Sequence, residues 1–201
     1  LKGSTFNTVA AANSLSGDVS ILVAGSNIDG VVSECQSLDN VSKVLKCDSE
    51  TYSNLVAEDV SALVLANCDG FTHILAPATT FGKNLMPRVA AKLDSQQISD
   101  IISIESDDTF KRPIYAGSCI ATVKSNDNTK IITIRPTSFD PVETSGGNEV
   151  VEKLDFEIQN NSVEFIEREE SQSERPELST ARVVISGGRG LQSADNFKLL
   201  N

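Results

Sequence analysis

Short apolar runs alternate with longer amphipathic stretches through the first half of the chain. The apolar runs are mostly β-branched and predict buried strands at 19–24, 43–46 and 73–76. Apolar residues recurring every three to four positions predict helices over 4–15, 31–38, 55–66 and 83–93. This alternation is typical of a mostly parallel sheet with helices on both faces, a three-layer α/β/α domain. We expect the three strands to share one sheet.

The pattern changes after position 97, where four β runs follow one another with short links. They lie at 98–103, 109–115, 118–124 and 130–135. Turn residues between them suit hairpins, which predicts an antiparallel excursion from the parallel sheet. Alternating residues further on predict exposed strands at 154–158 and 162–166.

The end of the chain reads as the opening of another domain. A polar, proline-containing stretch at 169–177 predicts a linker, so we place a first domain at 1–170 and a second at 171–201. Residues 183–186 predict a buried strand in a separate sheet, followed by a glycine turn and a helix from Ser193. An α/β domain normally opens with a strand, so we also expect a strand ahead of helix 4–15, outside this chain.

The glycine turn is the main candidate for chemistry. Gly187, Gly188 and Gly190 let the backbone approach a ligand closely, and Arg189 adds a fixed positive charge. Backbone N–H groups at such a turn suit an anion. A purely structural turn is the alternative, since the G-x-G-x-x-G spacing of dinucleotide folds is absent. The Asp-Ser pair of the ATP pyrophosphatase loop is absent too, which argues against AMP-forming chemistry.

Composition and charge argue against two classes of function, nucleic-acid binding and membrane insertion. The chain has 201 residues and a net charge of −11, and ten acids against three bases between Glu149 and Glu177 supply −7 of it. No basic stripe exists to neutralise phosphates, which disfavours nucleic-acid binding. The sequence contains no run of 18 apolar residues, so it predicts no segment that spans a membrane.

The cysteines and the histidine suggest no catalytic or metal site. The four cysteines have no metal-ligand spacing, and we expect buried free thiols at Cys35, Cys47, Cys68 and Cys119. His73 opens a strand and is interpreted as structural, which leaves a triad hydrolase poorly supported.

Six segments of the chain strongly resemble the α subunits of the electron transfer flavoprotein family. They are Phe81–Leu93, Ile98–Ile101, Ile114–Gly117, Thr137–Phe139, Arg175–Leu178 and Val184–Leu191, in the family's order over nearly the whole chain. The resemblance implies a first domain with the fold of adenine nucleotide alpha hydrolases, without their chemistry. It also implies the first strand, turn and helix of a Rossmann-like FAD-binding domain.

The resemblance further implies a function. The family is a heterodimer with one FAD, and Arg189 stands where the family has a flavin-contacting arginine. Its other flavin contacts would lie past the end of this chain, and AMP is expected in the β subunit. Electrons would come from acyl-CoA and other flavin dehydrogenases and leave through a quinone oxidoreductase. The protein would then be an electron carrier and not an enzyme, in the mitochondrial matrix or, for a bacterial source, the cytoplasm.

One alternative from a different class stays open. An adenine-nucleotide-binding enzyme or a stress-type binding module could share the fold of residues 1–170. The absent Asp-Ser pair, and the lack of a phosphate loop after the strand at 19–24, favour the electron carrier.

Overall fold

A computed structural model describes residues 1–144, 150–156, 163–169, 178, 181 and 183–200 of the chain. The chain divides into two compact units, Leu1–Phe165 and Ile166–Asn201. Each unit is described by itself below. The boundary between functional domains near position 170 stays a prediction.

The first unit contains two parallel three-stranded sheets. Sheet A has the order β1-β2-β9 and is formed by β1 (Val19–Gly25), β2 (Val41–Asp48) and β9 (Val151–Lys153). Sheet B has the order β3-β8-β4 and is formed by β3 (His73–Pro77), β8 (Lys130–Ile134) and β4 (Gln97–Ile101). The predicted α/β class with mostly parallel strands is confirmed. The expectation that the first three strands share one sheet is wrong, because β3 pairs with β8 and not with β1.

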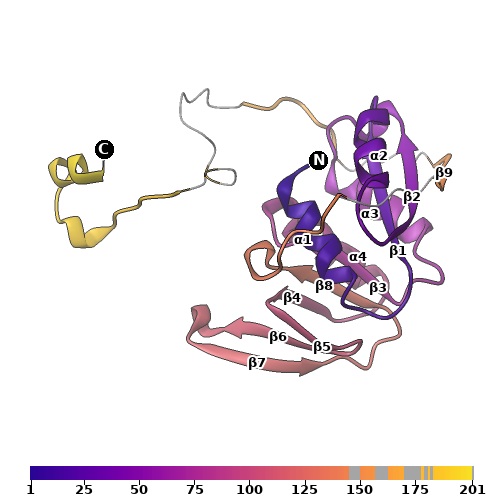
Figure 1. Ribbon diagram of the computed structural model, residues 1–201. Coiled ribbons are helices and arrows are strands. Elements are labelled where there is room, and N and C mark those ends of the chain that lie inside the picture. The colour runs from indigo at the N-terminus through magenta and orange to yellow at the C-terminus, as the bar shows by residue number, and fades with distance from the viewer. Residues whose placement is uncertain (145–149, 157–162, 170–177, 179–180, 182, 201) are drawn as a thin grey trace. The chain divides into compact units, whose positions relative to one another are not determined.

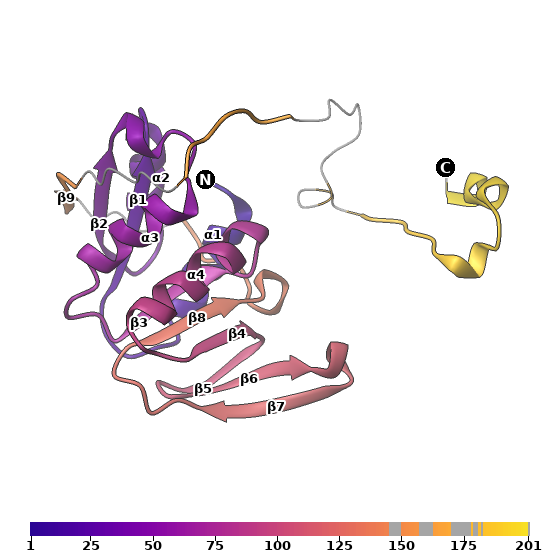
Figure 2. The same cartoon turned by 180° about the vertical axis from the view of Figure 1, so that it is seen from behind.

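Helices cover both faces of these sheets (Figures 1 and 2). They are α1 (Gly3–Ala12), α2 (Asp29–Gln36), α3 (Ala57–Ala66) and α4 (Thr80–Lys92). Buried residues of α1 and α2 share one apolar cluster with β1 and β2. Buried residues of α3 and α4 share another cluster on the opposite side, which also takes in side chains of β1 and β3. The strands supply both clusters because successive side chains of a strand point to opposite faces.

A third sheet is antiparallel. It has the order β5-β6-β7 and is formed by β5 (Ser103–Ser106), β6 (Thr109–Ile114) and β7 (Cys119–Lys124). Only this part of the predicted antiparallel run is antiparallel. The runs expected at 98–103 and 130–135 instead supply β4 and β8, and β8 is the central strand of sheet B. Its apolar run Ile131–Ile134 is buried, which is typical of a strand paired on both edges.

Two local predictions in the first unit need correction. The exposed strand expected at 154–158 lies earlier, as β9, where it pairs with the edge of β2, while Leu154–Phe156 form no strand. Positions 157–162 lie outside the described residues, and residues 163–166 form no strand. Backbone pairing with β2, and not side-chain alternation, decides where this strand lies.

The helix predicted over 83–93 starts earlier than expected. Thr79 caps α4 through the N–H of Gly82, at 3.3 Å from its side-chain oxygen. Pro87 is therefore inside the helix, on its exposed side. The carbonyl group that a proline leaves without a partner faces water there, which makes the proline tolerable.

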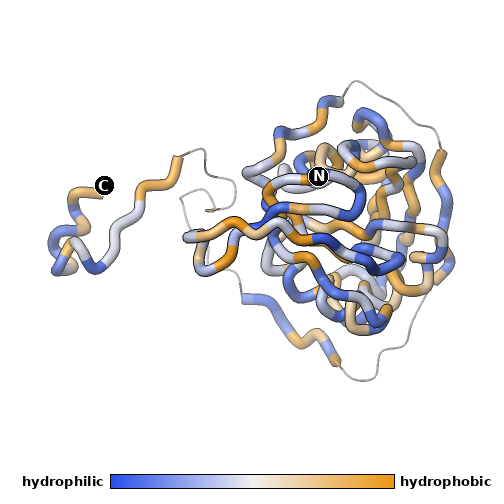
Figure 3. The backbone as a smooth tube through the Cα atoms, turned by 90° about the horizontal axis from the view of Figure 1, so that it is seen from below, coloured by the Kyte–Doolittle hydropathy of each residue, from blue (hydrophilic) through white to orange (hydrophobic). Residues whose placement is uncertain are grey.

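The second unit contains no strand among its described residues. Val183, Val184 and Ile185 were predicted as a buried strand but are 76%, 53% and 69% exposed. Figure 3 shows this run as a hydrophobic stretch of the tube. A strand needs a neighbour to pair its N–H and C=O groups, and no described segment pairs with this one. The predicted helix is instead a 3₁₀-helix, η5 (Ala194–Leu200).

Candidate functional site

The glycine turn forms a short 3₁₀ turn, η4 (Arg189–Leu191). The N–H of Leu191 donates to the carbonyl oxygen of Gly188 at 2.9 Å, and the N–H of Gln192 donates to that of Arg189 at 3.1 Å. Within the described part of the chain, the N–H groups of Gly188, Arg189 and Gly190 have no partner. Three free donors in succession are the groups that an anion would bind.

Glycine is needed at the start of this turn for close packing. A Cβ atom on Gly187 would lie 2.3 Å from a methyl carbon of Leu191 and 2.9 Å from one of Leu200. Gly188 and Gly190 have open space at the same position. The turn therefore packs on one side and stays open on the other.

Arg189 is exposed, and among the described residues its guanidinium has no hydrogen bond or ion pair. The nearest acid along the chain in this unit, Asp195, is 3.8 Å from Lys198. The alternative in which Arg189 only pairs with a neighbouring acid has no support among these residues. A guanidinium without an internal partner can donate its planar set of N–H groups to a ligand.

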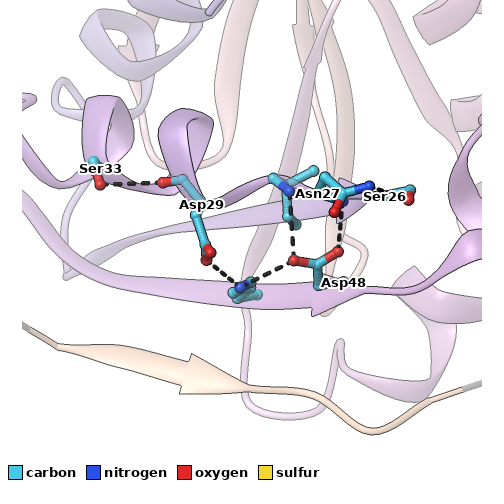
Figure 4. A network of polar contacts seen from close by, with 7 residues as sticks. Ser26, Asn27, Asp29, Ser33 and Asp48 are labelled. Atoms are coloured by element: carbon cyan, nitrogen blue, oxygen red, sulfur yellow. Dashed lines mark hydrogen bonds and ion pairs between the residues drawn. The ribbon is translucent and has the colours of Figure 1, made fainter.

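A second group of polar side chains lies at the carboxyl ends of β1 and β2, as Figure 4 shows. The carboxylate of Asp48 accepts from the backbone N–H of Asn27 at 2.8 Å and from that of Ile28 at 3.4 Å. Lys46 lies 3.0 Å from Asp48 and 2.5 Å from Asp29. Asp48 thus occupies the N–H groups where α2 begins, which is the position that a bound phosphate takes in many α/β proteins.

The ion pairs of this group shift the pKa values of Asp48 and Lys46. The hydrogen bond from Lys46 is the main cause that lowers the pKa of Asp48, and the two backbone N–H groups lower it further. The hydrogen bond to Asp29 is the main cause that raises the pKa of Lys46. Both groups therefore stay charged over a wide pH range. Sequence reasoning missed this arrangement, although an acid directly after a buried strand at the carboxyl edge was a usable signal.

His73 has a structural role. One ring nitrogen lies 2.8 Å from the hydroxyl of Thr72, and the other lies 2.6 Å from the carbonyl oxygen of Asp107. The ring therefore ties the start of β3 to the turn between β5 and β6.

The cysteines are all free, and the expectation of four buried thiols is partly wrong. Cys35 and Cys47 are buried, Cys68 is half-buried and Cys119 is exposed. Cys119 opens β7, an edge strand in which every position is exposed or half-buried.

The described residues hold no cluster of His, Cys, Asp or Glu side chains that could bind a metal ion. Among the helices that the structure describes, none is long and apolar enough to cross a membrane.

The first unit has parallel sheets between two helical layers. A polar segment and a glycine turn with an arginine follow along the chain. Together these features define a class of protein, and sequence similarity identifies it. The family definition "Electron transfer flavoprotein domain" matches residues 1–158. The chain therefore belongs to the electron transfer flavoprotein family, as its sequence motifs indicated.

Within that family, the chain is similar to α subunits along its whole length. It is 48% identical over 200 residues to the electron transfer flavoprotein subunit alpha of Pseudomonas aeruginosa, covering 100% of this chain and 65% of that protein. It is 42% identical over 198 residues to the probable mitochondrial subunit alpha of Caenorhabditis elegans, covering 98% and 60%. For the subunit alpha of Paracoccus denitrificans, identity is 41% over 199 residues, covering 99% and 64%. The chain thus spans less than two thirds of the length of these relatives.

Proposed function

We propose that the chain is part of the α subunit of a heterodimeric electron transfer flavoprotein. In this proposal the complete protein holds one FAD with a β subunit and carries electrons between other redox proteins. The observation that carries the proposal is the similarity to named α subunits, which extends over 98–100% of this chain. The relatives named here come from bacteria and an animal, and the animal protein's name includes "mitochondrial".

The described residues of the glycine turn suit an anionic cofactor. Three free N–H groups and the exposed guanidinium of Arg189 could hold the pyrophosphate or the isoalloxazine ring of FAD. Negative charge that develops on the ring would be stabilised by the guanidinium in a partly desolvated site. FAD, when bound, supplies the reversible uptake of electrons. Arg189 is proposed as a binding residue that positions this group and favours its charged form.

The remaining parts of the proposal come from the family. The electron donors are acyl-CoA dehydrogenases and other flavin dehydrogenases, and the acceptor is a quinone oxidoreductase. The β subunit carries AMP. The protein works in the mitochondrial matrix, or in the cytoplasm if the source is bacterial, and it turns over no substrate of its own.

The adenine-nucleotide-binding alternative is less well supported at the edge of sheet A. The N–H groups of Asn27 and Ile28, which could bind a phosphate, already donate to Asp48. A phosphate would have to displace that carboxylate and break its ion pair with Lys46. We therefore propose no nucleotide site there.

The proposal is tested on the longer protein that contains this chain, co-expressed with its β subunit. Absorbance between 350 and 500 nm should reveal one bound flavin per heterodimer. Under anaerobic conditions, an acyl-CoA and an acyl-CoA dehydrogenase should bleach that absorbance. A pure heterodimer without flavin absorbance would contradict the proposal. A flavin that stays oxidised would leave the class intact but contradict the proposed donors.

A further inference from the structure

One edge of sheet A is closed by the segment 150–156, which we call the strap. Its strand, β9, pairs in parallel with β2 over three residues and lies beside it in Figure 1. At one end of this pairing, the N–H of Val44 donates to the carbonyl oxygen of Val150 at 3.0 Å. At the other end, the N–H of Leu154 donates to the carbonyl oxygen of Lys46 at 2.7 Å. The strap therefore supplies hydrogen-bond partners for the middle of this edge of β2.

The side chains of the strap hold this edge from both faces of the sheet. Val151 packs against the apolar cluster of α1 and α2. Leu154 and Phe156 pack against the cluster of α3 and α4 on the opposite face. Odd and even positions separate in this way because successive side chains of an extended segment point to opposite faces. The strap thus contacts the core of the first unit on both sides of sheet A.

The carbonyl oxygen of Phe156 is held by two buried side chains. The hydroxyl of Tyr52 donates to it at 3.0 Å, and the Sγ atom of Cys47 lies 3.5 Å from it. Tyr52 and Cys47 are 0% and 1% exposed, and they belong to η1 (Glu50–Tyr52) and to β2. The end of the strap therefore contacts a hydroxyl and a thiol that are both shielded from water.

The strap is held less tightly than the strand that it covers. Among its seven residues, Val151, Leu154 and Phe156 are half-buried and the other four are exposed. In contrast, β2 has four buried residues. The ion pair between Lys43 and Glu152 joins side chains that are 41% and 52% exposed, and exposed pairs of this kind contribute little to stability. Because segments with few buried contacts open at a lower free energy than the core, we expect the strap to open first.

The rest of the first unit does not depend on the strap for its core. On its other edge, β2 pairs with β1 over seven residues. The nine buried residues of the α3–α4 cluster come from β2, β8, η1 and the two helices. Opening of the strap would leave these contacts in place. It would uncover one edge of β2 together with the side chain of Cys47.

We propose that the strap is a reversible closure of sheet A, which opens and closes as one piece while the other strands and helices stay folded. In the closed state it pairs the edge of β2 and shields the thiol of Cys47. In the open state the thiol reaches solvent, and the N–H and C=O groups of this edge are unpaired. An unpaired strand edge is the surface to which another strand can add. The strap thus controls the exposure of this edge of sheet A.

The first test follows alkylation of Cys47 in the folded 201-residue chain by peptide mapping over time. Cys35, which lies on α2 and is 0% exposed, reports on the rest of the unit. Burial raises the pKa of the Cys35 thiol to about 11, which slows its reaction. Each thiol is therefore compared only with itself, between wild type and variants.

Phe156→Ala removes the largest side chain of the strap and should raise the alkylation rate of Cys47 about tenfold or more. Phe139→Ala is the matched control, because Phe139 is also half-buried but packs against a different apolar cluster. It should leave the rate at Cys47 unchanged, and the rate at Cys35 should respond alike to both substitutions. A rise at Cys47 of the same size in Phe139→Ala, or no rise in Phe156→Ala, would overturn the proposal.

Hydrogen exchange in the wild-type chain provides a second measurement that needs no substitution. A peptide that covers the strap should exchange faster than one that covers β1, because the strap opens while β1 stays paired with β2. Equal protection of the two peptides, lost in a single step as denaturant is added, would mean that the strap opens only when the whole unit unfolds. That result would contradict the proposal.

Discussion

Replacing Arg189 by alanine tests the candidate site most directly. The substitution should leave the stability of the 201-residue chain within about 0.5 kcal/mol of wild type, because the side chain is exposed and, among the described residues, has no polar partner. In the complete heterodimer the same change should weaken FAD binding. Loss of one charge-assisted hydrogen bond costs about 1.5–3 kcal/mol, which corresponds to a roughly ten- to hundredfold rise in Kd.

Reduction of the bound flavin should change in the same variant. A guanidinium stabilises the negative charge that reduction adds, so Arg189→Ala should lower the flavin's reduction potential. Arg189→Lys should recover only part of both effects, because an ammonium group keeps the charge but lacks the planar set of donors. Lys198→Ala is a matched control, since it removes an exposed cation of the same unit that lies 3.8 Å from Asp195.

The assay is a titration of FAD into the apo-heterodimer, with a redox titration in parallel. Equal affinity and equal potential in wild type and Arg189→Ala would refute the reasoning, and Arg189 would then be an arginine on a structural turn. Equal losses in Arg189→Ala and Lys198→Ala would also refute it, because the effect would then reflect the general field of positive charge.

Four further predictions concern the first unit. Gly82→Ala should destabilise the chain by about 1–3 kcal/mol in urea unfolding, because the new Cβ would lie 2.0 Å from a backbone oxygen at the end of β3. Gly30→Ala, at a helical position with open space, should instead stabilise by up to about 1 kcal/mol. The hydrogen bond from Lys46 lowers the pKa of Asp48 in the folded protein from its ordinary value of 3.8. The charged Asp48 therefore stabilises the folded state above pH 3.8, and this stabilisation is lost as the pH falls through the folded-state pKa. Asp48→Asn should therefore flatten the acid limb of the stability curve, and an unchanged curve would contradict this. Burial raises the pKa of the Cys35 thiol to about 11, so a thiol reagent at pH 8 should label exposed Cys119 first and Cys35 last, as peptide mapping would show.

The elements of the first unit were largely predictable from the sequence, and their pairing was not. Apolar periodicity located α1, α3, β1 and β3 within a few residues. It could not reveal that β8 pairs with β3 and β4, because the partners of a strand depend on the path of the chain between them. The hairpin-like turn at 126–128, just before β8, suggested an antiparallel neighbour, but the parallel pairing buries the apolar run of β8 on both faces.

The candidate site was predictable in its residues and not in its local structure. The glycine spacing placed a tight turn around Arg189, and the turn is present as η4. The apolar run before it has the composition of a strand, yet composition provides no partner strand, and the run is exposed among the described residues. The Asp48 network was missed because it joins the turn after β1 to the end of β2, 20 and 21 positions apart along the chain.

The pairing of β3 with β8 also sets the order in which this domain can assemble during synthesis. His73 of β3 pairs with Lys130 of β8, so β3 leaves the ribosome roughly 60 residues before its partner, or about 3–12 s at ordinary translation rates. Through that interval β3 lacks its partner strand, and the buried residues of α4 that share a cluster with Ile131 of β8 lack that contact. A nascent chain stalled before β8 would expose these apolar side chains and an unpaired strand edge, which favours aggregation.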